Sequence, residues 1–232
     1  GKCEDGTACL AGKCEPVLTK STLSDVPKTM GIWPELIAAP GGSVLAVYHD
    51  SARGTLRAAR LASASATTWT KKTVAQSSDG DVLGAYPAAA TDASGLHVVF
   101  QNVTRGTLHY AQLDPTTLNE KSKAVVDDGL RPDGRHPVGA DAAAVIDASG
   151  GLRVMYQDQQ TSDLLLVSRT QAGAWTPTTA SDANLGRLLK GGDKGYGFYA
   201  DLVVAGGSLY GSSFVFEAGA IPPGLFEFFK LP

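Results

Sequence analysis

Short apolar runs recur along the chain, each about as long as one strand and each bounded by glycine, proline, aspartate or serine. The runs at residues 43–50, 96–102 and 152–158 show the pattern most clearly, because they are rich in β-branched, aromatic and other large apolar residues. Segments of this kind, joined by tight turns, are typical of β-strands. Apolar residues at helical spacing are almost absent. The pattern therefore predicts an all-β fold.

The apolar runs belong to a four-fold internal repeat. Behind each marker the same strand-like segments follow at nearly the same offsets, and Arg-Gly-Thr-Leu recurs verbatim at residues 53–56 and 105–108. A repeat of this length predicts sheets stacked radially against one another. The four markers are Gly31-Ile32-Trp33-Pro34, Gly84-Ala85-Tyr86-Pro87, Gly139-Ala140-Asp141-Ala142 and Gly197-Phe198-Tyr199-Ala200.

The last copy of the repeat is one strand short. The first three copies end in a further strand-like segment, at residues 69–74, 121–126 and 175–180, whereas the chain stops soon after the third segment of the fourth copy. An unpaired edge strand is a liability that β-proteins usually cover, and residues 15–20 lie at the right spacing before the first marker to do so. We therefore predict a four-bladed β-propeller closed by an N-terminal strand that completes the last blade.

Length and charge limit the class of protein. The chain has 232 residues, which suits one compact propeller domain over residues 15–232, with repeats starting near 31, 84, 139 and 197. The net charge is -3 and the lysines and arginines are scattered, so nucleic acid is not an expected partner. No apolar run approaches the roughly 20 residues that span a bilayer, so no transmembrane segment is expected. No cofactor motif is present in the sequence.

The three cysteines, Cys3, Cys9 and Cys14, all lie in a polar segment at residues 1–14. This spacing predicts a small disulfide-tied tag of the kind found in exported proteins, and hence a secreted or outer-surface location. An odd number leaves one thiol free or paired with a partner chain or an upstream segment, and a start at Gly1 fits removal of such a segment. Zinc is the rival interpretation, but Cys-x-x-Cys is missing, so no metal site is predicted.

Both parts of the chain resemble known secreted proteins. The tag is similar to the Cys- and Gly-rich segments of secreted proteins and lipoproteins from Gram-negative bacteria. In residues 31–229, apolar strands ending in Tyr-x-Asp or Phe-x-Asn and followed by Gly-x-Leu-x-x-Ala resemble the blades of bacterial secreted propellers, including the sialidase-like and fucose-lectin-like groups. The Asp-box and the arginine triad of sialidases have no counterpart here.

The repeat also indicates where a ligand would bind. Trp33, Tyr86, Asp141 and Tyr199 occupy equivalent positions where the inner strands begin, around the channel of a propeller. Flat aromatic faces beside polar groups suit a sugar or a peptide. Against this stands simple packing, in which the aromatic residues plug the channel.

Loops at the same end of the blades provide further candidates for ligand binding. His49 and Asp50 follow a second strand, and Arg135 and His136 lie in an insertion between blades. For Asp50, which recurs as Asn102 and Asp158, the alternative is a turn-stabilising role; for Arg135 and His136, the alternative is an exposed loop.

Catalytic signatures are not found. Asp50, Asp141, Asp158, Asp201 and Glu217 could lie near the channel, but the sequence selects no pair for glycoside hydrolysis. We therefore expect a non-catalytic extracellular binding or assembly module whose partner is a glycan or a surface protein. The alternatives are a glycoside-active enzyme on a propeller and a structural subunit of a surface fibre or complex, linked through the odd cysteine.

Overall fold

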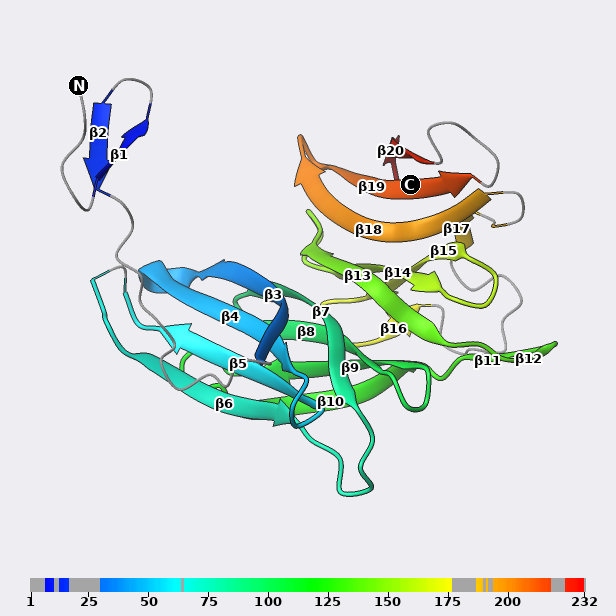
Figure 1. Ribbon diagram of the computed structural model, residues 1–232, viewed down its shortest axis with the longest axis horizontal. Coiled ribbons are helices and arrows are strands. Elements are labelled where there is room, and N and C mark those ends of the chain that lie inside the picture. Colours follow the sequence, from blue (N-terminus) through cyan, green and yellow to red (C-terminus); the bar gives the residue numbers. More distant parts are fainter. Residues whose placement is uncertain are drawn as a thin grey trace.

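Four antiparallel sheets stand side by side, each with its first strand toward the middle of the arrangement (Figure 1). The computed structural model describes residues 7–10, 13–16, 30–63, 65–176, 187–189, 191, 194–217 and 224–231. Apart from one short 3-10 turn, Pro40–Gly42, every regular element in these ranges is a strand. The predicted all-β class is confirmed, and the architecture is that of a β-propeller.

The strand order in each sheet follows the chain from the inside outward, as the repeat predicts. The first sheet contains β3 (Met30–Ala39), β4 (Ser43–Asp50), β5 (Thr55–Leu61) and β6 (Trp69–Ala75). The second contains β7 (Leu83–Asp92), β8 (Gly95–Asn102), β9 (Thr107–Leu113) and β10 (Glu120–Asp127).

The third and fourth sheets are less regular. The third contains β13 (Val138–Ile146), β14 (Leu152–Asp158), β15 (Asp163–Arg169), the short β16 (Trp175–Thr176) and β17 (Arg187–Leu189), which pairs with β15. The fourth contains β18 (Lys194–Ala205), β19 (Ser208–Glu217) and β20 (Gly224–Lys230). Two small hairpins lie outside these sheets, formed by β1 (Thr7–Leu10) with β2 (Lys13–Pro16) and by β11 (Leu130–Arg131) with β12 (Gly134–Arg135).

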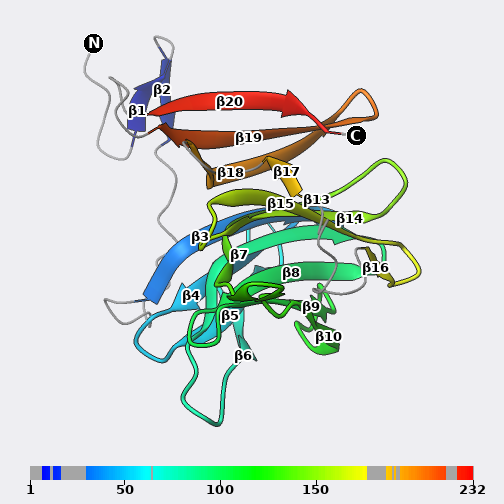
Figure 2. The same cartoon turned by 90° about the vertical axis from the view of Figure 1, so that its right-hand side faces the viewer.

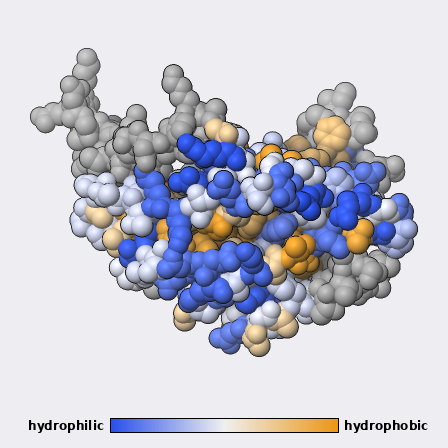
Figure 3. All heavy atoms as spheres, turned by 90° about the horizontal axis from the view of Figure 1, so that it is seen from below, coloured by the Kyte–Doolittle hydropathy of each residue, from blue (hydrophilic) through white to orange (hydrophobic). Residues whose placement is uncertain are grey.

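Apolar layers between neighbouring sheets form the core. One side of the first sheet packs against the second through Leu45, Val47 and Leu56, which are fully buried. The second sheet packs against the third in the same way, and the third against the fourth. Strand β8 is buried along its whole length because both of its faces are covered. Seen from below, the outer surface is mostly hydrophilic, with apolar side chains gathered toward its middle (Figure 3).

Two devices join each sheet to the next. A side chain at the end of the second strand donates a hydrogen bond to the carbonyl oxygen just before the next marker glycine; we call this bond the latch. The marker glycine itself lies against the preceding sheet: a Cβ at Gly84 would come within 2.6 Å of the Leu56 Cα. The latches run from His49 Nδ1 to Leu83 O (3.0 Å), from Gln101 Nε2 to Val138 O (2.8 Å) and from Gln157 Nε2 to Tyr196 O (2.5 Å).

Between the fourth and first sheets the ring is open in the described part of the chain. The inner strands pack consecutively from β3 through β7 and β13 to β18, whereas β18 and β3 do not pack closely against each other. Both joining devices are missing there: Phe214 stands at the latch position of the fourth sheet, opposite Phe198, and a Cβ at Gly31 would meet nothing within 4 Å. In Figures 1 and 2, β18–β20 form the upper end of the arrangement of sheets.

The predicted closing strand is not seen in the described residues. Glu15 and Pro16 belong to β2, which pairs with β1 and not with β20, and residues 17–29 lie outside the described ranges. The described residues thus contain four blade-like sheets, and the last keeps three strands. Closure by residues 15–20 stays a prediction.

The marker glycines allow a matched test of the contact between sheets. Gly31 and Gly84 have φ of 82° and 87°, so alanine carries a similar backbone cost of about 1–2 kcal/mol at either position. Only at Gly84 does the new Cβ also collide with a neighbouring sheet, which adds about 1–3 kcal/mol. We expect Gly84→Ala to lower the free energy of unfolding in urea clearly more than Gly31→Ala. Equal losses would mean that the close approach does not stabilise the ring.

Candidate functional site

The same backbone irregularity occurs in every inner strand. The pairing register shifts twice near each marker, so each inner strand carries extra residues relative to its neighbour. The marker glycines have φ between 82° and 95°, and the residues two positions later are also left-handed although they are not glycine: Trp33 (50°), Tyr86 (47°), Asp141 (46°) and Tyr199 (49°). Left-handed backbone costs such residues of order 1–2 kcal/mol and is concentrated at functional sites.

The bulges bring these four side chains into one cavity. It has a volume of about 300 Å³ and is lined from β3, β7, β13 and β18; we call it the central funnel. All four residues expected at the channel, Trp33, Tyr86, Asp141 and Tyr199, line the funnel. A cavity of this size is at the lower end of the range for small-molecule sites, which is enough for one or two sugar rings.

Aromatic rings form one part of the funnel. The ring centroids of Trp33 and Tyr86 lie 4.3 Å apart, with an angle of 32° between the ring planes. The ring of His49, on β4, has its centroid 5.7 Å from that of Trp33. Tyr199 is 72% exposed, so its ring is open to a ligand. Burial raises the pKa of Tyr86, and the charges of Asp141 and Tyr199 add to this effect. Tyr86 is therefore a neutral hydrogen-bonding group at physiological pH.

Carboxyl groups form the other part. Glu35, Asp141 and Asp201 all line the funnel. Burial raises the pKa of Glu35 from 4.5 to about 7, against the effect of a 2.6 Å hydrogen bond from the Ala89 N–H, and the nearby charge of Asp201 raises it further. Burial also raises the pKa of Asp141, opposed by a hydrogen bond from the Tyr199 backbone. The funnel thus holds a carboxyl group that binds a proton near neutral pH, within electrostatic range of a second carboxyl group.

Glu35 was not among the residues predicted for the site. It stands at the head of an apolar strand segment, which hides it from a search for paired carboxylates. Repeat alignment contains the signal that would have found it: the fourth residue after each marker glycine is Glu35, Ala88, Ala143 or Asp201. A position that is alanine in two copies and acidic in the other two, next to the channel, indicates a specific role for the acids.

His49 and Asp50 are held by bonds within the protein. The His49 Nδ1–H supplies the first latch, and burial lowers the pKa of the ring. Asp50 is fully buried and pairs with Arg53 at 3.0 Å, and its Oδ1 accepts a hydrogen bond from the Arg53 N–H. Neither residue lines the funnel.

Arg135 and His136 lie apart from the funnel. His136 is buried and forms contacts of 2.8 Å with Asp158 and 3.1 Å with Asp133, while the Arg135 guanidinium donates to the Asp128 carbonyl oxygen. Arg135 is therefore exposed, as the alternative interpretation expected, whereas His136 is buried. The insertion contains a buried ionic cluster, in which His136 contacts Asp158 and Arg131 binds Asp127 at 2.8 Å.

The cysteine tag is described only in part. Cys9 and Cys14 stand opposite each other in the β1–β2 ladder, and Cys3 lies outside the described residues. Within the described ranges, no group of three or more His, Cys, Asp or Glu residues is arranged to hold a metal ion. In those same ranges no helix is both long and apolar enough to cross a membrane.

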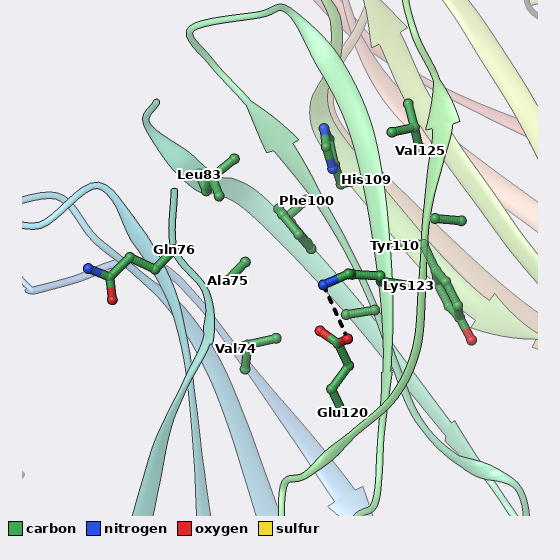
Figure 4. A pocket seen from close by; sticks show the side chains of 12 residues that line it. Val74, Ala75, Gln76, Leu83, Phe100, His109, Tyr110, Glu120, Lys123 and Val125 are labelled. Atoms are coloured by element: carbon green, nitrogen blue, oxygen red, sulfur yellow. Dashed lines mark ion pairs between the residues drawn. The ribbon is translucent and has the colours of Figure 1, made fainter. Parts of the chain in front are cut away.

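A second cavity, of about 380 Å³, opens between the outer strands of the first and second sheets (Figure 4). Its walls are mainly apolar, and its charged groups are Lys123 and Glu120, which pair at 3.5 Å. Burial lowers the pKa of His109 there, assisted by the charge of Arg105. Since its single carboxyl group is already paired with a lysine, this cavity lacks the second carboxyl group that the central funnel has for acid–base chemistry.

Comparison with known proteins relates the chain to others through its fold alone. No protein-family model matches the sequence, and no curated protein matches it significantly. Among solved structures, the GH43 endo-arabinanase from Bacillus licheniformis is 16% identical, with a TM-score of 0.51 over 86% of this chain and 72% of that one. An α-L-arabinanase from Cellvibrio cellulosa, complexed with arabinohexaose, is 14% identical, with a TM-score of 0.55 over 86% and 73%.

A third similar structure is an α-L-arabinofuranosidase from Podospora anserina in complex with cellotriose, which is 11% identical with a TM-score of 0.51 over 85% of this chain and 71% of that one. These similarities establish the β-propeller fold. The narrower resemblance to sialidase-like and fucose-lectin-like propellers, and the disulfide-tied tag, stay predictions.

The neighbours also correct the main functional expectation. Each is a carbohydrate-cleaving enzyme by name, and each match covers 85% or 86% of this chain. The prediction of a non-catalytic binding or assembly module is therefore wrong, and the alternative of a glycoside-active enzyme is favoured. The expectation rested on the absence of a recognisable carboxylate pair in the sequence, whereas the folded chain brings Glu35 and Asp201 into one cavity.

The proton on Glu35 has a measurable effect on stability. Because its pKa is about 7 in the folded protein and near 4.5 in the unfolded chain, folding is favoured at low pH, and this contribution is lost as the pH rises through 7. We expect Glu35→Gln to gain up to about 3 kcal/mol relative to the wild type between pH 5 and pH 8. Urea unfolding of both proteins at the two pH values measures it, and a difference that does not change with pH would contradict the raised pKa.

Proposed function

We propose that the protein is a glycoside hydrolase whose active site is the central funnel. The single observation that carries this proposal is the pairing of a protonated Glu35 with a nearby Asp201 carboxylate at repeat-equivalent positions. The fold similarity to arabinanases and an arabinofuranosidase supports it.

Hydrolysis of a glycosidic bond needs two carboxyl groups in different protonation states. Glu35 is the general acid, because burial keeps its proton up to about pH 7. As the bond between the anomeric carbon and the leaving oxygen breaks, that oxygen takes the Glu35 proton. Asp201, which is exposed and lines the same cavity, acts as the general base: it accepts a proton from the water molecule whose oxygen forms the new bond to the anomeric carbon.

The remaining funnel residues bind the sugar. Trp33 and Tyr86 offer adjacent aromatic faces for stacking against the apolar side of a sugar ring. Asp141 is half-buried beside them and accepts a hydrogen bond from the Tyr199 backbone, which leaves carboxyl lone pairs for sugar hydroxyls. Its left-handed backbone fixes the direction in which the side chain leaves the strand.

The neighbours indicate which substrates to test first. Their names refer to arabinan, arabinohexaose and arabinofuranosides, and other similar structures are exo-β-1,3-galactanases. We therefore propose a polysaccharide carrying arabinofuranosyl or galactosyl units as substrate class. A secreted or outer-surface location, as the cysteine pattern predicts, would give the protein access to such polymers.

Removal of either carboxyl group tests the proposed roles. We expect Glu35→Gln and Asp201→Asn each to lower kcat on arabinan or β-1,3-galactan by about 10²–10⁴-fold, the range for loss of an acid–base group. Release of reducing sugar measures the activity. Glu120→Gln, which alters a paired carboxylate in the cavity between the outer strands, is the matched control and should retain wild-type activity. Full activity in both funnel variants would refute the assignment.

The pH profile tests the acid separately. Because Glu35 must carry its proton to act, kcat/KM should fall about tenfold per pH unit above about pH 7. The residual kcat/KM of Glu35→Gln should not show this fall at high pH, since the glutamine side chain does not titrate in this range. A fall that survives in the variant would assign the general acid to a different group.

A further inference from the structure

The outward face of the fourth sheet carries several exposed aromatic side chains. Its aromatic side chains point away from the third sheet, and several are strongly exposed: Phe228 is 81% exposed and Phe226 56% exposed. The strand register shows that they share one face, since Phe214 stands opposite Phe226 and Ser212 opposite Phe228. The residues of this face, which we call the aromatic track, are Tyr199, Val203, Tyr210, Ser212, Phe214, Phe216, Phe226 and Phe228.

The track is continuous with the central funnel. Tyr199 lines the funnel, and its ring lies 6.3 Å from Phe214, which lies 5.8 Å from Phe226, which in turn lies 6.2 Å from Phe228. A shallow cavity of about 240 Å³ lies on the same face, between Asp201, Tyr210 and Phe228. Asp201 lines both this cavity and the funnel. A chain leaving the funnel past Asp201 would therefore lie directly on the aromatic track.

The composition of the track differs from the faces that bind neighbouring sheets. Those faces are mainly aliphatic, as in the layer formed by Ala143, Met155 and Leu164 on the third sheet, and aromatic rings within such layers, such as Phe100, Tyr110 and Tyr156, are buried. The equivalent face of the fourth sheet places Asp201 where the third has Ala143, and its latch position holds Phe214 in place of a donor. Exposed rings interspersed with hydroxyl and carboxylate groups suit a sugar chain better than a further sheet.

We propose that the aromatic track binds the part of a polysaccharide chain that extends beyond the funnel. This inference rests on the proposed function, since it assigns a polymeric substrate to the same site. Phe226 and Phe228 are the distal contacts: they stack against sugar rings and take no part in bond cleavage. The track therefore contributes to the affinity for polymers and contributes nothing to the cleavage of short substrates.

The test combines binding and kinetics in a Phe226→Ser/Phe228→Ser double variant. Both side chains are exposed, so the fold should persist, and the urea unfolding midpoint checks this. The measurement is affinity electrophoresis through gels that contain arabinan or β-1,3-galactan. We expect one of the two polymers to retard both the wild type and Glu35→Gln. For the double variant, the apparent Kd for that polymer should be about tenfold higher. KM should rise by a similar factor on that polymer, with kcat on a chromogenic arabinofuranoside or galactoside unchanged. Val125→Ser, which removes an exposed apolar side chain from β10, is the matched control and should change neither.

The outcomes separate this proposal from the catalytic one. Retardation that depends on Phe226 and Phe228, without turnover of any substrate, would support the track and refute the hydrolase. Turnover with unchanged polymer affinity in the double variant would refute the track alone, as would a wild type that neither polymer retards. A wild-type dimer that the double variant converts to monomer, measured by light scattering, would assign the face to a protein interface and overturn the proposal.

Discussion

The contact of each sheet with the next is the constraint on which the rest of the structure depends. A donor at the end of one second strand binds the carbonyl oxygen before the next marker glycine, and the glycine lies against the preceding sheet where a Cβ would not fit. Hydrogen bonds buried in this way specify geometry, because a misplaced sheet would leave the donor unsatisfied. The latch also holds the start of the inner strand, where the bulge begins, so the joint between sheets sets the position of the functional residues.

Chemistry in the funnel follows from where these joints place the side chains. Glu35 lies on the wall between the first and second sheets, and it accepts a hydrogen bond from Ala89 of the neighbouring sheet. Burial there keeps its proton, whereas Asp201 faces the open side of the ring and is exposed. One repeat position thus yields two different carboxyl environments, because one copy of it is covered by a following sheet and the other is not. Paired acids in contrasting surroundings are the usual basis of acid–base catalysis by carboxyl groups.

The repeat in the sequence was sufficient to predict the strands, their order and the four channel residues, because period-two patterning and turn residues are local signals. The repeat places Glu35 and Asp201 at equivalent positions, but it could not predict the raised pKa of Glu35, which arises only when a neighbouring sheet partly buries the carboxyl group. Nor could it place His136, whose partner Asp158 is 22 residues away along the chain and becomes adjacent only when β13 pairs with β14, with Val138 opposite Asp158. His49 forms a latch, as the amide donors Gln101 and Gln157 do at the equivalent positions, and ligand binding by His49 stays a prediction.

The left-handed residues at the funnel have an implication for how such a site can change during evolution. At the second, third and fourth markers the latch and the close contact of the glycine hold the start of the inner strand, whereas the first marker has neither, and the four copies still carry Trp, Tyr, Asp and Tyr on one backbone geometry. At each position, therefore, the side chain that contacts a ligand can be exchanged without a change in the scaffold. Aspartate is among the non-glycine residues that tolerate left-handed backbone best, so Asp141 marks the exchange that costs the scaffold least, and aspartate and asparagine should be the substitutions most readily fixed at the other three.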